Sequence, residues 1–485
     1  MVATITAEAK RRLIDDLKKD ADLPPRSHTL GADSAATKYY IGISKSEDWN
    51  ATDAAPAPIN SEKEQRDFRY GLQSVKQVAN YSFVIPRENW TTGSPYAAYN
   101  DTIVAHPTVP YYAMTEANAV YVCTRAGTNA AGVAVPSTVQ PSGSSTKGLI
   151  TSDGYAWKFL YTIGTLDASF YKSANFIPVK LQGPTTGSSP ATDVEQLAIQ
   201  NAAVAGRQII GFSLDSGGAG YTSNPTVTIT GDGDLTANSG AHAEAIASGG
   251  SIVKIVLKDD SANAANAIEM GQGFNFASIA LSGGGASSQT TGKVIFGPKA
   301  GLGADPRDDL RARAIMFNVK PVGDEDGEFI VGNSFRQIGL IRNPLSTDSA
   351  SAGGAFSSSD GNCLRRLQMQ GTAALSFTPG SIMSNGALAG EAGKAYAYVN
   401  KVDSNEIWYH QTETTGFTQF AEAEAITDAA GGSGTTQATG TDTDALAFHE
   451  SKVDKFSGQL LYIENAAAVV RAADQTEDIK VIIEI

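Results

Sequence analysis

The stretch from Phe456 to Ile485 constrains the fold more than any other part of the sequence. It reads FSGQLLYIENAAAVVRAADQTEDIKVIIEI, and its final run alternates, with Ile479, Val481, Ile483 and Ile485 on one face and Lys480, Ile482 and Glu484 on the other. A period of two predicts a half-buried β-strand. So apolar a segment needs a sheet that earlier segments have already built. We expect it to close a core domain, next to residues 153–163, 312–319 and 335–341.

The composition indicates a mainly β protein. The chain has 485 residues, of which 49 are glycine and 18% are charged, which is typical of short strands joined by turns. This length predicts two or three domains. A net charge of −14 argues against nucleic acid or anionic membrane as the main partner and favours protein partners. We find no membrane-spanning run and no signal peptide, so we expect assembly from the cytosol.

The two cysteines, Cys123 and Cys363, are too few for a disulfide framework or a thiolate zinc site. We interpret both as reduced, semi-buried small hydrophobic residues. A single bridge between them is the alternative.

The first part of the chain combines strands with two helices. Residues 6–19 predict an amphipathic helix with a basic face. A second helix begins at Ser61, whose capping box is completed by Glu64, and it continues through Phe68, Leu72, Val75 and Ala79. Strands are expected at 38–44, 83–90, 121–125 and 153–163; the last should bury the face with Trp157, Phe159, Tyr161 and Ile163.

Two stretches of different composition interrupt this pattern. Residues 182–193 predict a linker, and after it two similar Gly-rich segments begin at Gly220 and Gly273, which favours a small duplicated all-β module over 183–305. A second insertion, 348–449, contains a predicted hairpin, 394–402 with 406–413, and a low-complexity tract, 429–444, expected to be flexible. We therefore predict an α+β, mainly β protein with a discontinuous core domain, a β-sheet sandwich with a few helices formed by 1–182, 306–347 and 450–485.

No catalytic, cofactor or metal site is predicted. The run from Gly285 to Val294 has the wrong spacing for a phosphate loop, and the acidic runs at 324–328 and 231–234 lack the ligand pattern of calcium loops, so all three are interpreted as turns. The histidines, at positions 28, 106, 242, 410 and 449, show no zinc spacing. Trp408, Tyr409 and His410 could form a sugar-binding groove, but neighbouring strand residues face opposite sides, which favours a division between core and surface.

Four segments together resemble a known family. VIPRENW (84–90), SDGYAWKFLYTI (152–163), FRQIGLIRNPL (335–345) and the stretch 457–485 are similar, in this order, to signature stretches of the baseplate wedge subunit of T-even-type contractile-tailed phages. KYYIGISKSEDW (38–49) is similar to that family's opening strand. The resemblance covers about 1–182, 306–347 and 450–485 and leaves out both insertions.

The resemblance implies a non-enzymatic virion protein of the tail baseplate, assembled in the bacterial host cytoplasm. It implies a homodimer that bridges other wedge and pin proteins, with no cofactor, nucleic acid or membrane and no catalytic residues to carry over. The alternative is a host-surface carbohydrate-binding tail protein, motivated by the two insertions. A hydrolase would need a pair of carboxylic acids on converging strands, and no spacing singles one out.

Overall fold

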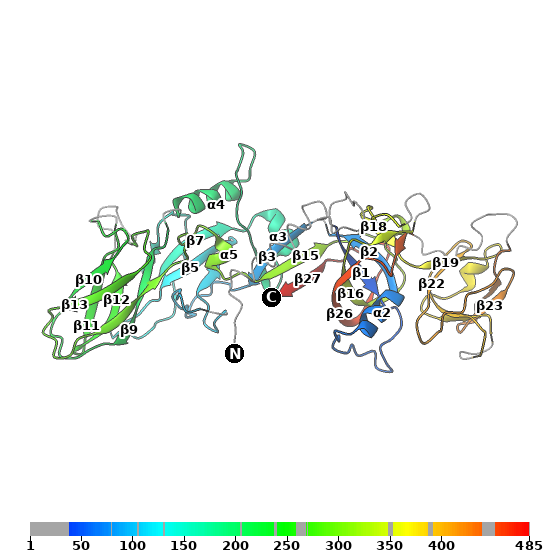
Figure 1. Ribbon diagram of the computed structural model, residues 1–485, viewed down its shortest axis with the longest axis horizontal. Helices are drawn as coiled ribbons and strands as arrows, with labels where there is room; N and C mark the ends of the chain where they lie inside the picture. Colours follow the sequence, from blue (N-terminus) through cyan, green and yellow to red (C-terminus); the bar gives the residue numbers. More distant parts are fainter. Residues whose placement is uncertain are drawn as a thin grey trace. The chain divides into compact units, whose positions relative to one another are not determined.

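The computed structural model describes residues 38–78, 80–103, 106–129, 131–203, 206–236, 240–258, 268, 270–347, 353–386, 391–438 and 452–484 (Figure 1). These residues divide into two compact units. Unit 1 contains 82–316 and 482–484, and unit 2 contains 38–81 and 317–481. The predicted core segments are shared between the two units, and each unit contains one of the predicted insertions. The predicted helix at 6–19 lies outside the described residues.

The predicted mainly β, α+β class is confirmed, because several antiparallel sheets dominate both units. No helix among the described residues is long and apolar enough to cross a membrane. Neither Cys123 nor Cys363 forms a disulfide, so the alternative of a bridge between them is wrong. Both side chains are fully buried, whereas the sequence predicted semi-buried ones.

Unit 2 is built on a five-stranded sheet in the order β18-β2-β1-β16-β26. Its strands are β1 (Tyr39–Ser44), β2 (Leu72–Gln77), β16 (Ser334–Arg342), β18 (Asp360–Asn362) and β26 (Gln459–Val470). Helix α2 (Glu62–Tyr70) packs Phe68 onto Gly42 and Gly339, where a side chain would clash with the Phe68 ring or with Leu72. A core of Tyr40, Leu72, Val75 and Ile341 surrounds this contact.

The helix at Ser61 begins as predicted but ends early. The Ser61 side chain accepts a hydrogen bond from the Glu64 amide, which confirms the N-terminal cap. The helix stops before Gly71, whose amide donates to the Asp67 carbonyl. Leu72 and Val75 lie in β2, paired with β1, so their assignment to the helix was wrong. Backbone pairing with β1 outweighs the helical spacing of these residues.

The second insertion forms a six-stranded sheet in unit 2, in the order β19-β22-β21-β20-β23-β24. The strands are β19 (Arg365–Gln368), β20 (Ile382–Ser384), β21 (Tyr396–Asp403), β22 (Glu406–His410), β23 (Ala425–Asp428) and β24 (Ser433–Thr435). The predicted hairpin is confirmed, since β21 and β22 pair antiparallel. The expectation of a flexible tract is wrong for β24, which pairs with β23 beside the short 3-10 helix η2 (Ala373–Ser376). Unit 2 is completed by the strand pair β17 (Leu345–Ser346) and β25 (Val453–Asp454) and by the 3-10 helix η1 (Glu325–Gly327).

Unit 1 contains a four-stranded sheet in the order β4-β5-β7-β6. Its strands are β4 (Tyr112–Met114), β5 (Ala119–Arg125), β6 (Leu149–Ile150) and β7 (Ala156–Thr162). Residues on both faces of β7 are buried, including Lys158 and Leu160, whereas the sequence predicted one buried face. The described part of unit 1 contains the helices α3 (Thr165–Tyr171), α4 (Ala191–Ala202) and α5 (Pro306–Asp309).

Helix α4 begins inside the predicted linker and contains its last three residues, 191–193. It packs against β7, and its glutamines bind the preceding segment: Gln196 donates to the Lys180 carbonyl at 2.7 Å, and Gln200 accepts from the Gln182 amide at 2.9 Å. The assignment of 191–193 to a linker was wrong because these tertiary contacts cannot be read from a Gly-, Ser- and Pro-rich composition.

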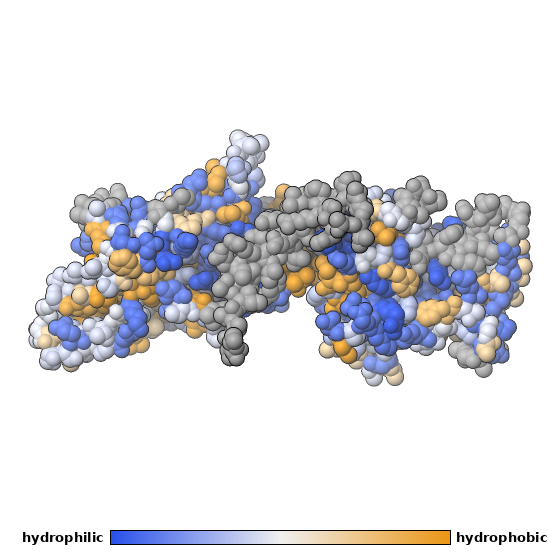
Figure 2. All heavy atoms as spheres, viewed as in Figure 1, coloured by the Kyte–Doolittle hydropathy of each residue, from blue (hydrophilic) through white to orange (hydrophobic). Residues whose placement is uncertain are grey.

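The first insertion forms three antiparallel strand pairs in unit 1. They are β9 (Ile209–Ser216) with β14 (Thr291–Phe296), β10 (Thr226–Gly231) with β13 (Ala277–Ser282), and β11 (Ala243–Ser248) with β12 (Ser251–Leu257). The strands of the two similar segments pair with each other, with Ile229 opposite Ile279. Apolar residues are visible on the outer surface of this module in Figure 2, where strands such as β10 alternate exposed and half-buried residues.

The second four-stranded sheet contains the end of the chain and has the order β27-β15-β3-β8. Its strands are β3 (Asn80–Pro86), β8 (Phe176–Val179), β15 (Ala314–Val319) and β27 (Ile479–Glu484). The alternating strand is confirmed, with Ile479 and Val481 buried. It lies beside β15, one of the three expected neighbours. In the same C-terminal stretch β26 pairs with β16, which confirms 335–341 as a second expected neighbour. The expectation for 153–163 was wrong, because β7 belongs to another sheet.

Candidate interaction surface

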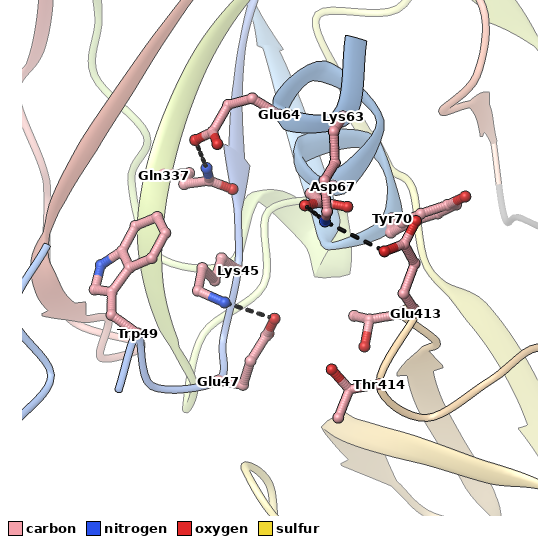
Figure 3. A pocket seen from close by; sticks show the side chains of 11 residues that line it. Lys45, Glu47, Trp49, Lys63, Glu64, Asp67, Tyr70, Gln337, Glu413 and Thr414 are labelled. Carbon is pink, nitrogen blue, oxygen red and sulfur yellow. Dashed lines mark hydrogen bonds and ion pairs between the residues drawn. The ribbon is translucent and has the colours of Figure 1, made fainter. Parts of the chain in front are cut away.

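A charged cavity of about 170 Å³ lies in unit 2 between α2, the chain after β1 and the turn after β22 (Figure 3). The residues that line it are Lys45, Glu47, Trp49, Lys63, Glu64, Asp67, Tyr70, Gln337, Thr412, Glu413 and Thr414. Most of these side chains are charged or polar, so the cavity is a candidate for acid–base chemistry.

Both lysines that line this cavity form ion pairs with carboxylates. Lys63 lies 2.6 Å from Asp67 and 3.2 Å from Glu413, and Lys45 lies 2.9 Å from Glu47 (Figure 3). Hydrogen bonds from Arg66 and Lys63 hold the pKa of Glu413 below its usual value. An acid catalyst needs the opposite shift, a raised carboxyl pKa. We therefore interpret the cavity as a junction between α2 and the second insertion.

Buried His410 joins the second insertion to the chain after β1. Its Nδ1 lies 2.6 Å from the Asn400 side-chain oxygen, and its Nε2 lies 3.3 Å from a Glu47 carboxylate oxygen. Burial tends to raise the pKa of Glu47, but His410 and Lys45 together lower it well below its usual value. Glu47 is therefore held ionised as a structural partner.

Trp408, Tyr409 and His410 are the three residues that the sequence suggested for sugar binding, and the first two are divided as predicted. Tyr409 lies in the core of the six-stranded sheet, whereas Trp408 is half-buried, with the Arg366 guanidinium 5.8 Å from its ring centre. His410 is also buried, because Glu47 and Tyr398 cover it. The three residues do not form one groove.

Strand β26 lies at the edge of the five-stranded sheet among the described residues. It is 12 residues long and contains a single charged residue, Glu464, which accepts a hydrogen bond from Tyr462 at 2.7 Å. Leu461 is 42% exposed and Val470 66% exposed. Edge strands are usually protected by lysine, proline or a covering segment, and β26 contains neither residue. Such a strand is suited to pairing with another chain.

An apolar groove of about 310 Å³ runs beside the first half of this strand. We call it the edge groove; it is lined by Pro58, Ile59, Asn60, Gln65, Leu460, Leu461, Tyr462 and Ile463. Ile59 is 67% exposed, so the wall formed by the loop before α2 presents apolar surface to solvent. An exposed apolar strip next to an exposed strand edge is typical of a protein–protein interface.

The loop wall of the edge groove is fixed by specific polar contacts. Buried Arg336 on β16 binds Asp53 at 2.7 Å, and it also contacts Asp48. The Trp49 indole donates to the Ala466 carbonyl at 3.0 Å, and the Asn465 side chain donates to the Pro56 carbonyl at 3.2 Å. The groove is therefore preorganised, which lowers the entropic cost of binding a partner.

An aromatic cluster on unit 2 adds to the exposed apolar surface. Tyr70 at the end of α2 lies 4.9 Å from Phe417 and 5.9 Å from Phe456, measured between ring centres. Phe417 and Phe456 are each 48% exposed. Exposed aromatic residues are frequent anchors of protein interfaces.

The acidic run at 324–328 contains η1, and two of its carboxylates, those of Glu325 and Glu328, form ion pairs. Glu325 lies 2.6 Å from Lys76, and Glu328 pairs with Lys452 and accepts from the Asn362 amide at 3.0 Å. In the run at 231–234, Asp232 accepts from the amides of Asn275 and Phe276. Within the described ranges, no group of three or more His, Cys, Asp and Glu side chains could hold a metal ion.

The remaining predicted site residues do not converge. His106 and His242 lie in unit 1, far along the chain from His410 in unit 2, and His28 and His449 lie outside the described residues. The run from Gly285 ends in β14, where Gly292 and Val294 pair with β9. Sequence reasoning missed the edge groove, because the loop before α2 and β26 are about four hundred residues apart in sequence. The apolar, charge-poor run of β26 was the signal that could have indicated it.

Neither a scan against protein-family models nor a search of curated proteins gives a match for this chain.

Proposed function

We propose that this chain is a structural virion protein, a baseplate wedge component of a contractile phage tail. It acts as a homodimer that bridges neighbouring wedge and pin proteins, is assembled in the bacterial host cytoplasm and performs no catalysis. The resemblance of residues 84–90, 152–163, 335–345 and 457–485 to that family motivates the proposal. The observation that carries it is the exposed edge of β26 beside the edge groove.

A second copy of the chain is the partner that best suits this edge. Two copies related by a twofold axis present the same surface to each other, and two edge strands can then continue one sheet into the next. Glu464 is the only charge on β26, so two antiparallel strands can approach without a row of like charges facing each other. Ile59 and Leu461 provide apolar area for the contact.

The test is the oligomeric state of two single variants, Ile59→Asp and Leu461→Asp. A buried, unpaired carboxylate at either position should weaken the dimer at least about 100-fold, that is, by about 3 kcal/mol. Sedimentation velocity at micromolar concentrations measures this directly. Both side chains are exposed in the single chain, so the variants should fold normally.

The matched control is Leu375→Asp, on η2 of the same unit, where the leucine is similarly exposed. It should remain a dimer. A chain that is strictly monomeric before mutation, or a control that dissociates as readily as the two groove variants, would refute the proposed interface.

A further inference from the structure

A large pocket of about 630 Å³ with both polar and apolar lining lies in unit 1, and none of its lining residues belongs to the first insertion. Four segments form it: the chain after β3, the turn between β4 and β5, the end of α3, and the loop between β5 and β6. The lining residues are Arg87, Asn89, Trp90, Thr91, Thr92, Met114, Thr115, Glu116, Gln140 and Lys172. Its size is in the range of small-ligand sites.

Two cations in this pocket have only neutral partners. The Arg87 guanidinium donates to the Asn89 side-chain oxygen and the Ser173 carbonyl, each at 3.0 Å. Lys172 donates to the Asn118 side-chain oxygen at 2.6 Å. Neither forms an ion pair with a carboxylate in the described part of the chain, although both lysines that line the charged cavity in unit 2 do.

The two cations also affect each other. Burial, and then the charge of Arg87, lower the pKa of Lys172. Glu116 lines the pocket but is exposed and contributes nothing to this shift. A bound anion would relieve the repulsion between Arg87 and Lys172, so the pocket is electrostatically prepared for a negative group.

Trp90 supplies a fixed aromatic surface next to these cations. Its indole nitrogen donates to the Ser137 hydroxyl at 3.2 Å, its backbone amide donates to the Met114 carbonyl at 2.8 Å, and its ring packs on the core cluster that contains Tyr96 and Trp157. The indole nitrogen is thus satisfied by the protein, and what the side chain offers to the pocket is apolar ring.

We propose that this pocket binds an acidic carbohydrate, with a sugar ring against Trp90 and its carboxylate between Arg87 and Lys172. The hydroxyl and amide groups of the pocket, on Asn89, Thr91, Thr92, Thr115 and Gln140, are suited to sugar hydroxyls. The net charge of −14 disfavours a long nucleic acid, and the polar lining disfavours an apolar ligand. The sequence had suggested glycan binding by the two insertions, and this pocket lies outside both of them.

The experiment is isothermal titration calorimetry of the full chain with a hyaluronan tetrasaccharide, which contains glucuronate. Its neutral counterpart is chitotetraose. We expect saturable binding of hyaluronan with a Kd of about 0.1–1 mM, and at least about tenfold weaker binding of chitotetraose. Lys172→Gln and Trp90→Leu should each weaken hyaluronan binding about tenfold, whereas Lys172→Arg and Trp90→Phe should retain most of it.

The control variant is Lys293→Gln, an exposed lysine on β14 in the same unit, which should bind like the unmodified chain. Equal affinity for chitotetraose, equal affinity for acetate alone, or full binding by Lys172→Gln would each overturn the proposal. Absence of binding by the unmodified chain would do the same. Neither the pocket nor this assay depends on dimerisation, so its outcome is independent of the test of the edge groove.

Discussion

At the scale of single residues, buried charges connect segments that are distant in sequence. Arg471 is fully buried and binds Glu477 at 2.8 Å, the carbonyls of Phe329 and Ile330 at 2.8 Å, and the carbonyl of Gly323 at 2.7 Å. In the sequence, Arg471 is an ordinary charged residue between two apolar runs. In the structure, it fixes the turn between β26 and β27, a role that depends entirely on the carbonyls brought to it by folding.

His106 predicts an acid sensitivity of unit 1. Burial, and then the charge of Arg313, lower its pKa from 6.5 to about 4, and the charge of Glu484 opposes this only in part. The folded state therefore keeps the imidazole neutral while the unfolded chain binds a proton. The neutral His106 side chain therefore makes its full contribution to the free energy of unfolding above pH 6.5. This contribution is lost as the pH falls toward 4, and the loss is at most about 3 kcal/mol.

The variant His106→Gln should make the midpoint of thermal unfolding less dependent on pH between about 7 and 5 than in the unmodified chain. Differential scanning calorimetry at several pH values measures this midpoint for the variant and the unmodified chain. Glu116→Gln, at an exposed site of the same unit, is the control and should leave the pH dependence unchanged. If the unfolding midpoint of His106→Gln changed with pH as steeply as that of the unmodified chain, His106 would not be the source of the acid sensitivity.

At the scale of elements, local chemistry was predictable, whereas strand neighbours were predictable only in part. The Ser61 cap and the β21–β22 hairpin depend on residues close in sequence, and both are confirmed. The spacing of Phe68, Leu72 and Val75 is helical, yet only Phe68 is in the helix, because β2 gains a full ladder with β1. The helical spacing of these residues gives no information about the pairing of β2 with β1, which depends on residues about thirty positions earlier in the chain.

The same limit applies to the candidate sites. The sequence indicated an apolar final stretch that had to join a sheet, but not that β26 would be an edge strand. Edge position depends on which strands pair, and β26 pairs only with β16 among the described strands. The acidic-sugar pocket likewise combines Trp90, Gln140 and Lys172, none of which is near the others in sequence.

Removal of β27 should prevent folding of the sheet it joins. A chain truncated before Asp478 exposes β15 and loses the buried side chains of Ile479 and Val481, each of which is worth about 1.5–3 kcal/mol. We expect aggregated or proteolysed protein, measured as the soluble fraction after expression. The control, Glu484→Gln, removes only the exposed ion pair with Arg313 and should stay soluble. Normal yield of the truncated chain would refute this role.

At the scale of the whole molecule, the first insertion should be dispensable for dimerisation. The Gly297 amide donates to the Gln208 carbonyl at 2.9 Å, so a short glycine linker can replace the residues between them. The edge groove lies entirely in the other unit. We expect this deletion variant to dimerise with a Kd within about threefold of the unmodified chain, as sites without shared contacts are usually independent. Sedimentation velocity tests this; a folded monomer would contradict it.

The position of β26 in the chain also has a consequence during synthesis on the ribosome. The strand is made after β1, β2, β16 and β18, the other four strands of its sheet. Within residues 82–316 of unit 1, the sheet of β4, β5, β6 and β7 and the first insertion are complete early and can fold while unit 2 is still unfinished. The exposed edge of β26 therefore forms only after the other strands of its sheet have been synthesised. This order shortens the time in which β26 strands of nascent chains on one messenger can pair with each other before their own sheets are complete.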